Sequence, residues 1–221
     1  MRINKYIAQA TDLSRRSADT AIDNGRVRVN GQKPDAGAMV GGEDVVTLDG
    51  AVVSPPKEST TIIFNKPVGY VCSREGQGSK TIYDILPTEY QQLNSVGRLD
   101  KDSSGLLLLT NDGQLAQELT HPSYQKDKIY ELQLDRQLTE QDRQRIEQGI
   151  ELEDGISKFS VKPRGNTLVA TLQEGRNRQI RRTFEALGYT VTNLHRTHFG
   201  PYQLENLDPG SIKQVTVREH Y

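Results

Sequence analysis

Residues 97–110 read GRLDKDSSGLLLLT, and this stretch places two carboxylates in a polar turn directly before a run of four leucines. A leucine run bounded by turn signals is typical of a buried strand. We therefore expect Asp100 and Asp102 to lie at the end of a core strand, where a rigid scaffold can position a catalytic group. On spacing alone, an ordinary Asp-rich turn with local backbone hydrogen bonds is an equally good interpretation.

The length and charge of the chain allow a nucleic-acid-binding protein without requiring one. With 221 residues it can form one substantial core and a small additional module. Its formal net charge of −1 is unusual for a protein that contacts phosphates. Local patches still matter, because physiological salt screens exposed charges more than about 8–10 Å apart. The basic residues do cluster, at Arg15-Arg16, at Arg26 and Arg28, and at Arg176, Arg178, Arg181 and Arg182.

The cysteine and histidine content argues against disulfide and metal chemistry. The single cysteine, Cys72, cannot form an internal disulfide, and we expect it to be a packing residue in a strand over residues 70–73. No metal is predicted, because no ligand-spaced partners accompany the four histidines, His121, His195, His198 and His220. The absence of a long apolar run and of a signal-peptide pattern predicts a cytoplasmic protein.

The first module is predicted to span residues 1–53 and to bury a small core. Helical spacing of apolar residues, a good N-cap and alternating valines indicate two short helices followed by a β-hairpin. The expected elements are a helix containing Ile3, Ile7 and Ala10, a helix capped by Ser14 and ended by Gly25, a strand over residues 26–29 turning at Asn30-Gly31, and short strands over residues 45–48 and 52–53.

Residues 54–59, SPPKES, predict a stiff linker, since they contain two prolines and no hydrophobic pattern. An ordinary surface loop within a single domain is the alternative. From residue 60 to residue 221, short strands alternate with a few helices, which indicates an α+β domain with a largely antiparallel sheet. The expected strands cover residues 60–65, 70–73, 106–110, 129–134, 159–162, 168–172, 190–194 and 213–217, and the expected helices cover residues 114–119, residues 139–148 and a segment capped by Asn177 that ends at Gly188.

The segment GRLDKDSSGLLLLTNDG resembles the signature segment of bacterial ribosomal-RNA pseudouridine synthases of the RsuA/RluB/RluF type, and the resemblance extends through most of the chain. In that family the acid of the GRLD element is the essential carboxylate, which falls here on Asp100. The segments MRINKYIAQA, SRRSAD and NGRVRVNGQ resemble the ribosomal S-four-like RNA-binding domain. These resemblances imply a small docking domain followed by a catalytic domain whose central mixed sheet carries the active site.

The resemblance implies two further catalytic residues. In EGRNRQIRR, helical geometry places Arg181 at the edge of the buried face and turns Arg178 and Arg182 outward. The family pattern implies that Arg181 pairs with the catalytic carboxylate, whereas a purely solvated basic face is the alternative. By itself Tyr130, in KIYEL, would be a core tyrosine. The resemblance implies that it stacks near the extruded base and assists proton transfer.

Several basic residues are expected to contact RNA. Uracil must be taken out of the folded RNA, and Arg98 could fill the gap or hold the neighbouring phosphate. An internal ion pair with Asp102 is its competing role. The other expected RNA contacts are Arg15, Arg16, Arg26, Arg28, Arg178, Arg182 and Lys66. A solvated charged face is the alternative for the N-terminal arginines, and an ordinary turn is the alternative for Lys66.

The predicted function is the isomerisation of a specific uridine to pseudouridine in ribosomal RNA, with the GRLDKD and RNRQIRR forms favouring the large subunit. The reaction involves no redox change and therefore needs no cofactor. A single ionised carboxylate beside a cation can attack the sugar carbon or remove a sugar proton. The expected partner is ribosomal RNA or an assembling subunit, and the chain is expected to act as a monomer.

Two other functions fit part of this pattern. One is a non-catalytic RNA-binding or ribosome-assembly factor that retains the fold, although pure binding needs no acid facing the RNA. The other is a glycoside hydrolase, which usually requires two carboxylates at the scissile bond. Asp100 and Asp102 are two residues apart in one turn and are poorly placed to flank a sugar from opposite sides.

Overall fold

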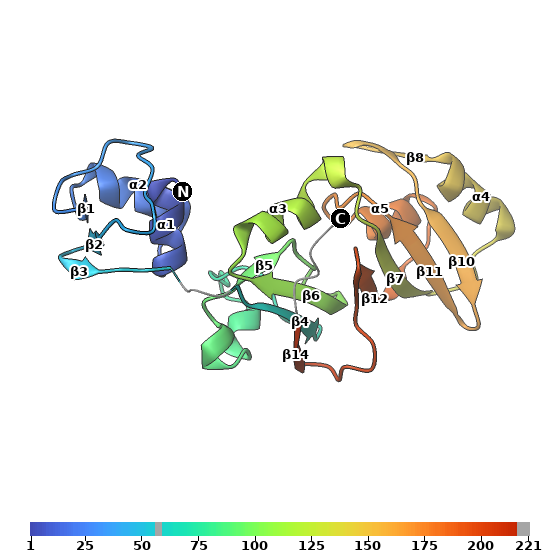
Figure 1. Cartoon of the computed structure of the whole chain (residues 1–221). Helices are drawn as coiled ribbons and strands as arrows, with labels where there is room; N and C mark the ends of the chain where they lie inside the picture. Colours follow the sequence, from blue (N-terminus) through green and yellow to red (C-terminus); the bar gives the residue numbers. More distant parts are fainter. Residues whose placement is uncertain (56–58, 216–221) are drawn as a thin grey trace. The chain divides into compact units, whose positions relative to one another are not determined.

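The computed structural model describes residues 1–55 and 59–215 and divides into two compact units, Met1–Ser59 and Thr60–Tyr221 (Figure 1). Half of the predicted linker, residues 56–58, lies outside the described residues. In the described part of the chain, no helix combines the length and the apolar character that crossing a membrane requires.

The first unit packs two helices on a small antiparallel sheet. Its elements are α1 (Ile3–Ala10), α2 (Arg15–Asp23), β1 (Val27–Val29), β2 (Val46–Leu48) and β3 (Ala51–Val52). The predicted N-cap is confirmed, since the Ser14 hydroxyl accepts a hydrogen bond from the Ser17 amide. The predicted apolar stripes meet in one core, which contains Ile3, Ile7, Ala18, Ala21, Ile22, Val27, Val40 and Val46.

The predicted hairpin at Asn30-Gly31 is only partly correct. Both residues have positive φ, 51° and 80°, as a tight two-residue turn requires. The returning chain forms only an isolated bridge, between Val29 and Gln32, and the strand partner of β1 is β2. Residues 33–44, KPDAGAMVGGED, are rich in proline, glycine and acidic residues, which disfavour a continuing strand.

The second unit is built on one mixed sheet, as the fold class predicted. Among the described residues its main path runs β10-β11-β7-β12-β6-β4-β14, with β13 beside β12 and β5 beside β6. Every pair is antiparallel except β12 with β6. The strands are β4 (Thr61–Lys66), β5 (Asn94–Val96), β6 (Ser104–Thr110), β7 (Lys128–Leu134), β10 (Ser160–Arg164), β11 (Thr167–Leu172), β12 (Val191–Phe199), β13 (Tyr202–Gln203) and β14 (Ile212–Val215).

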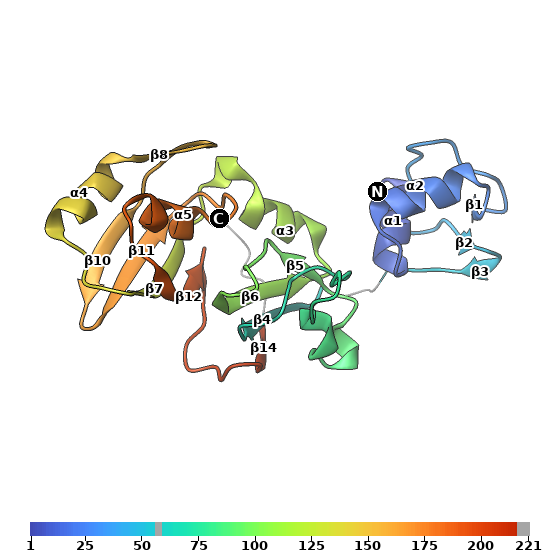
Figure 2. The ribbon, with the colours of Figure 1, turned by 180° about the vertical axis from the view of Figure 1, so that it is seen from behind.

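The leucine run of β6 is buried on both faces of the sheet. Leu106 and Leu108 pack with α3 (Gly113–Thr120), while Leu107 and Leu109 pack on the opposite side against the segment that contains the short helices η1 (Ile82–Asp84) and η2 (Thr88–Tyr90). Figure 2 shows α3 on one side of β5 and β6. The expectation that this run forms a core strand is confirmed.

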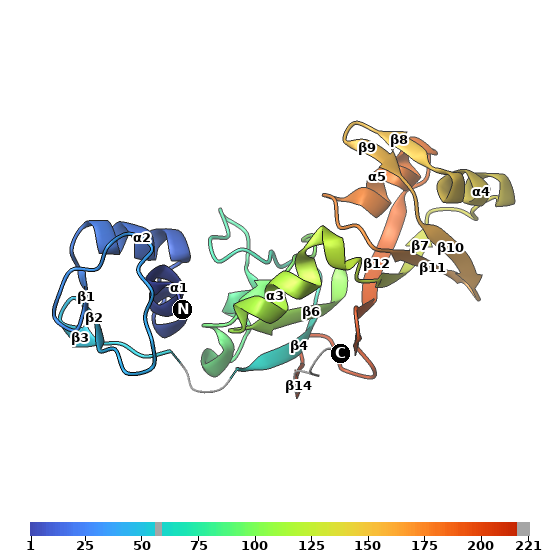
Figure 3. The same ribbon diagram turned by 45° about the horizontal axis from the view of Figure 1, so that its top comes forward.

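The other half of the sheet has a core of its own. The helices α4 (Glu140–Gln148) and α5 (Gln179–Ala186) pack their apolar residues against β7, β10 and β11. A small hairpin of β8 (Ile150–Leu152) and β9 (Gly155–Ser157) follows α4 (Figure 3). Within the sheet, the two halves join through the parallel pair of β6 and β12, whose register places His195 beside Ser104 and Arg196 beside Gly105.

Two predicted elements of this unit differ from the structure. Residues 70–73 form no strand, and Val71 makes only an isolated bridge to Thr81. Asn177 does not cap α5, which starts after Arg178 in the left-handed conformation, with φ of 47°. The predicted end at Gly188 is confirmed. The last predicted strand is observed as β14, and its residues 216–217 lie outside the described range.

Candidate active site

A cleft of about 1630 Å³ opens in the second unit where the two half-sheets meet. Its lining includes the loop before β6 and residues of β7, β12 and the start of α5. Asp100, Tyr130 and Arg98 all line it, and so do Arg178 and Arg196. The structure thus brings the predicted acid, from the loop before β6, and the predicted tyrosine, from β7, to one cavity.

A buried lysine holds the loop that carries Asp100. Lys66 is fully buried at the end of β4. Its ammonium donates to the carbonyl oxygens of Pro67 (3.0 Å), Asp100 (3.1 Å) and Ser103 (2.7 Å). Burial lowers the pKa of Lys66, and the nearby carboxylates partly counteract that effect. The predicted RNA contact of Lys66 is therefore wrong, since its side chain faces the protein interior and fixes the loop.

Cys72 holds the same loop from another side. Its thiol donates to the Leu99 carbonyl (3.3 Å) and accepts from the Leu99 amide (3.4 Å). Burial raises the pKa of this thiol, which keeps it protonated. The interpretation of Cys72 as a packing residue fits this geometry, although its position is a loop and not a strand.

The two carboxylates of the loop have different surroundings. Asp102 is bound by both terminal nitrogens of Arg178 (2.9 and 3.0 Å), and Nε of Arg181 lies 3.3 Å from its Oδ2. The Arg178 hydrogen bonds hold the pKa of Asp102 below its ordinary value. Asp100, whose side chain is 29% exposed, has its nearest guanidinium nitrogen on Arg178, at 3.9 Å.

This arrangement corrects the predicted partner of the catalytic carboxylate. Arg181 does turn inward, with 11% of its side chain exposed, but it pairs with Asp102 and not with Asp100. Its terminal nitrogens donate to the carbonyl oxygens of Val191 and Asp102, both at 2.8 Å. Arg178, expected to face solvent or RNA, is the cation beside Asp100. Helical geometry predicted that Arg181 turns inward, but it could not predict whether Arg181 pairs with Asp100 or with Asp102.

Tyr130 lies across the cleft from the acid loop. It is on β7, where its neighbours in register are Ala170 of β11 and Arg196 of β12. The ring packs against the cores on both sides of the cleft and remains partly exposed. This position is compatible with the expected stacking on a base.

Sequence reasoning did not identify Arg196 as part of this site. Its side chain is 2% exposed, and its Nε donates to the Leu106 carbonyl at 2.8 Å. The close approach of β12 to β6 depends on Gly105, because a Cβ there would lie 2.3 Å from the Arg196 carbonyl oxygen. The LHRTHF segment gives no sign of this burial, because a basic residue in a strand usually indicates an exposed face.

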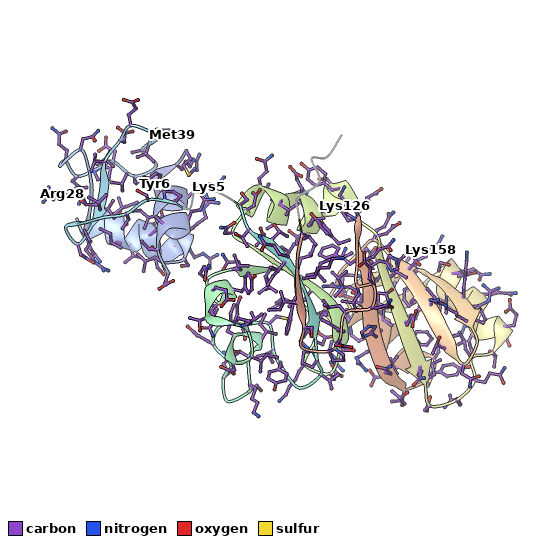
Figure 4. All side chains as sticks on the ribbon, turned by 60° about the horizontal axis from the view of Figure 1, so that its bottom comes forward. Lys5, Tyr6, Arg28, Met39, Lys126 and Lys158 are labelled. Carbon is purple, nitrogen blue, oxygen red and sulfur yellow. The ribbon has the colours of Figure 1, made fainter. Side chains whose placement is uncertain are left out.

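The cleft has a positive rim. Arg98 is exposed next to Asp100, and the described ion pairs of Asp102 are with Arg178 and Arg181, so the competing role of Arg98 is not observed. Lys126, between α3 and β7, and Lys158, between β9 and β10, also line the cavity (Figure 4). These lysines were not predicted, and they offer further positions for phosphate groups.

Other predicted RNA contacts are engaged within the protein. Arg182 binds Asp154 with two nitrogens, at 3.0 and 2.7 Å, and thereby connects α5 to the β8–β9 hairpin. Arg176 binds the same carboxylate at 3.0 Å. Arg182 is therefore held by an acid and is not free on an outward face, as was expected.

The N-terminal arginines also differ from one another. Arg15 and Arg16 are exposed in the first turn of α2, as predicted. Arg26 is exposed but forms a two-point ion pair with Asp49. Arg28, labelled in Figure 4, donates to the Gly31 carbonyl at 3.2 Å. The first pair is thus the less constrained of the two clusters.

The described residues contain no cluster of three or more histidine, cysteine or acidic side chains arranged to hold a metal ion. His195 instead hydrogen-bonds the Ser104 hydroxyl (2.9 Å), and burial lowers its pKa. His121 and His198 bond neighbouring hydroxyls, whereas His220 lies outside the described range.

Both units of the chain match known families. A family model described as RNA pseudouridylate synthase matches residues 60–186, and an S4 domain model matches residues 1–46. Ribosomal large subunit pseudouridine synthase B of Bacillus subtilis is 35% identical, over 99% of this chain and 93% of its own. The protein of that name from Pseudomonas aeruginosa is 37% identical over 99% of this chain but only 60% of its own length. A solved pseudouridylate synthase superposes with a TM-score of 0.70 at 30% identity, covering 98% of this chain and 96% of that chain.

Proposed function

Because this chain belongs to the RNA pseudouridylate synthase family, we propose that it converts a uridine of large-subunit ribosomal RNA to pseudouridine, with Asp100 as the catalytic carboxylate. The observation that carries the proposal is the position of Asp100 in the cleft, with Arg178 3.9 Å away and Tyr130 of β7 lining the same cavity. The names of the similar proteins support the large subunit as the source of the substrate.

In the cleft, the Asp100 carboxylate lies beside a guanidinium group. Arg178 supplies the positive charge, and Asp102 with Arg181 fixes the position of that guanidinium. The carboxylate can then attack C1′ of the ribose or remove a sugar proton. The loop is held by buried groups and needs little reorganisation on binding, which favours catalysis by positioning.

Each remaining residue has a part in this proposal. Tyr130 stacks on the extruded base, and Arg98 fills the vacated place in the RNA or holds the neighbouring phosphate. The first unit docks on folded RNA through Arg15 and Arg16. This unit is assigned to residues 1–53, the linker to residues 54–59 and the catalytic domain to residues 60–221. We expect the protein to act as a cytoplasmic monomer without a small-molecule cofactor, on free rRNA or an assembling subunit.

The surroundings of Asp102 weaken the glycoside hydrolase alternative. Two guanidinium groups bind this carboxylate and lower its pKa, so it is ionised at neutral pH and cannot donate a proton to a leaving sugar. The non-catalytic alternative leaves the buried support of the Asp100 loop without a purpose, since RNA binding does not require a fixed acid.

The proposal is tested with Asp100→Asn, a nearly isosteric change. Purified variant and parent are incubated with large-subunit rRNA, and pseudouridine is mapped by carbodiimide labelling and primer extension. We expect the parent to modify one position, the variant to form no product, and both to bind the RNA with similar Kd. Asp208→Asn, an exposed acid in the same unit, serves as the control and should remain active. Turnover by the Asp100 variant would remove this residue from its role, and an inactive parent would refute the function.

A further inference from the structure

The floor of the cleft contains a buried cation that has no acidic partner. Arg196 is 2% exposed and lines the cavity, yet among the described residues it forms no ion pair. Its Nε is satisfied by Leu106, whereas its Nη2 is buried without any hydrogen-bond partner. A buried donor left unpaired costs about 1–3 kcal/mol, and more when it is charged. Such a group is therefore a candidate for binding something absent from the free protein.

Other positively charged side chains lie near Arg196 and repel its charge. Its neighbours include two further cations, Lys66 and Lys128, and burial together with the positive charge of Arg196 lowers the pKa of both, against the opposite effect of nearby carboxylates. Arg196 and Lys128 lie against the Phe199 ring, with their cationic centres 4.9 and 5.4 Å from its centroid. An electron-rich ligand in the cleft would relieve the repulsion among these groups.

We propose that Arg196 binds the uracil ring during the reaction and stabilises the negative charge that the ring carries once its bond to the sugar is broken. This inference rests on the proposed function. It assigns Arg196 as a catalytic residue in addition to Asp100, and it gives a ligand to the buried Nη2, which has no hydrogen-bond partner among the described residues.

The chemistry of the isomerisation supplies the charge. When the C1′–N1 bond breaks, its electron pair leaves with N1 and spreads over the ring to O2 and O4. C5 then forms the new bond to C1′, the C5 proton is lost and N1 takes up a proton, so that the product is an isomer of the substrate. A donor fixed beside the carbonyl oxygens binds the detached ring more strongly than the intact base, which lowers the barrier to cleavage.

Position favours the base over a phosphate as the ligand. Arg196 is the neighbour in register of Tyr130, the residue expected to stack on the base. It is buried at the floor, whereas Lys158 and Arg98, which suit a hydrated phosphate, are exposed on the lining. A planar neutral ring can enter a buried site at lower cost than an ion with a permanent charge.

The test uses the full-length protein and compares two RNA substrates whose bases differ as leaving groups. Single-turnover cleavage of the C1′–N1 bond is measured, by mass spectrometry of nuclease digests, on RNA with uridine or 5-fluorouridine at the target position. Fluorine stabilises the detached ring as an anion, so cleavage of the C1′–N1 bond in 5-fluorouridine should depend less on Arg196 than cleavage in uridine. Arg196→Gln and Arg196→Lys are the variants, and Arg164→Gln is the matched control, because Arg164 is an exposed arginine on β10.

We expect Arg196→Gln to cleave uridine about 10²–10³-fold more slowly, as for loss of one donor to a developing anion. Arg196→Lys should recover part of this rate, the penalty should shrink at least about tenfold on 5-fluorouridine, and the RNA Kd should stay within about threefold of the parent. Equal penalties on the two substrates, or a loss of RNA affinity with unchanged cleavage, would overturn the proposal.

Misfolding and failure of the overall function give different results. Misfolding of the glutamine variant would appear in its thermal unfolding, and the lysine variant then carries the comparison, because it keeps the charge. A parent that forms no pseudouridine refutes the proposed function itself. A parent that forms pseudouridine, with fully active Arg196 variants, refutes only the role of Arg196.

Discussion

Replacing Lys66 by methionine tests whether a buried ammonium holds the catalytic loop. The change removes the donor to three backbone carbonyls, of which those of Asp100 and Ser103 belong to the loop. A buried carbonyl without a donor costs about 1–3 kcal/mol. The loss is partly offset because the charged ammonium no longer has to be desolvated. We expect the free energy of unfolding to fall by about 2–4 kcal/mol.

The same substitution should damage catalysis more than binding. Without Lys66 the loop can shift, and a displacement of about 1 Å at a reacting group can reduce the rate about 10²-fold. Single-turnover pseudouridine formation measures this loss, hydrogen exchange of the Ser103 amide measures loop opening, and calorimetry measures stability. Lys162→Met, at an exposed position on β10, is the control and should change stability by less than about 0.5 kcal/mol.

Two results would refute this reasoning about Lys66. Parent-like stability and rate in Lys66→Met would mean that the three hydrogen bonds do not determine the loop position. A weaker RNA Kd with an unchanged rate on bound RNA would restore the direct RNA contact predicted from the KPVG turn.

Two further predictions concern the junction of the half-sheets and the acid pair. Gly105→Ala should destabilise the protein by about 3 kcal/mol or more, because the φ of this residue is +105° and the added Cβ would overlap the β12 backbone. Calorimetry measures the loss, and Gly113→Ala is the control, because a Cβ at residue 113 would have no neighbouring atom within 4 Å. The pairing of Asp102 with Arg178 stabilises the fold above the unfolded-state pKa, near 3.8, and this stabilisation is lost as the pH falls through the lower folded-state pKa. Asp102→Asn should therefore reduce the fall in unfolding free energy on acidification by about 0.2–1 kcal/mol, the value for a partly exposed pair. Denaturant unfolding measured at several acidic pH values checks this, and an unchanged pH dependence would contradict the assignment.

Local patterns were sufficient for most of the fold. The leucine run, the apolar stripes of the helices and the end of α5 at Gly188 each depend on neighbours within a few residues, and all are observed. The strand expected at residues 70–73 was wrong because the Val71 amide donates to the Lys80 carbonyl and the Val71 carbonyl accepts from the Ile82 amide, so this backbone pairs with a nearby loop and not with the sheet. The Cys72 thiol binds both polar groups of Leu99, and composition does not reveal such a distant contact.

The site residues were harder to predict because their roles depend on distant partners. The KPVG segment correctly indicated a turn but could not show that Lys66 points inward to carbonyls far along the chain. The spacing of Arg178 and Arg181 gave their angular positions on α5, whereas the choice between Asp100 and Asp102 depends on how the loop meets the helix. Arg196 carried no usable signal, since a basic residue in a strand usually indicates an exposed face.

The division of the catalytic unit between two half-sheets has a consequence for synthesis. The acid loop and its supports, Lys66 and Cys72, belong to the half that a ribosome makes first, whereas Arg178 and Arg196 come from α5 and β12. A nascent chain that has not yet reached α5 carries the carboxylate without either guanidinium. On the roles proposed for these residues, the site is complete only after β12 has been made.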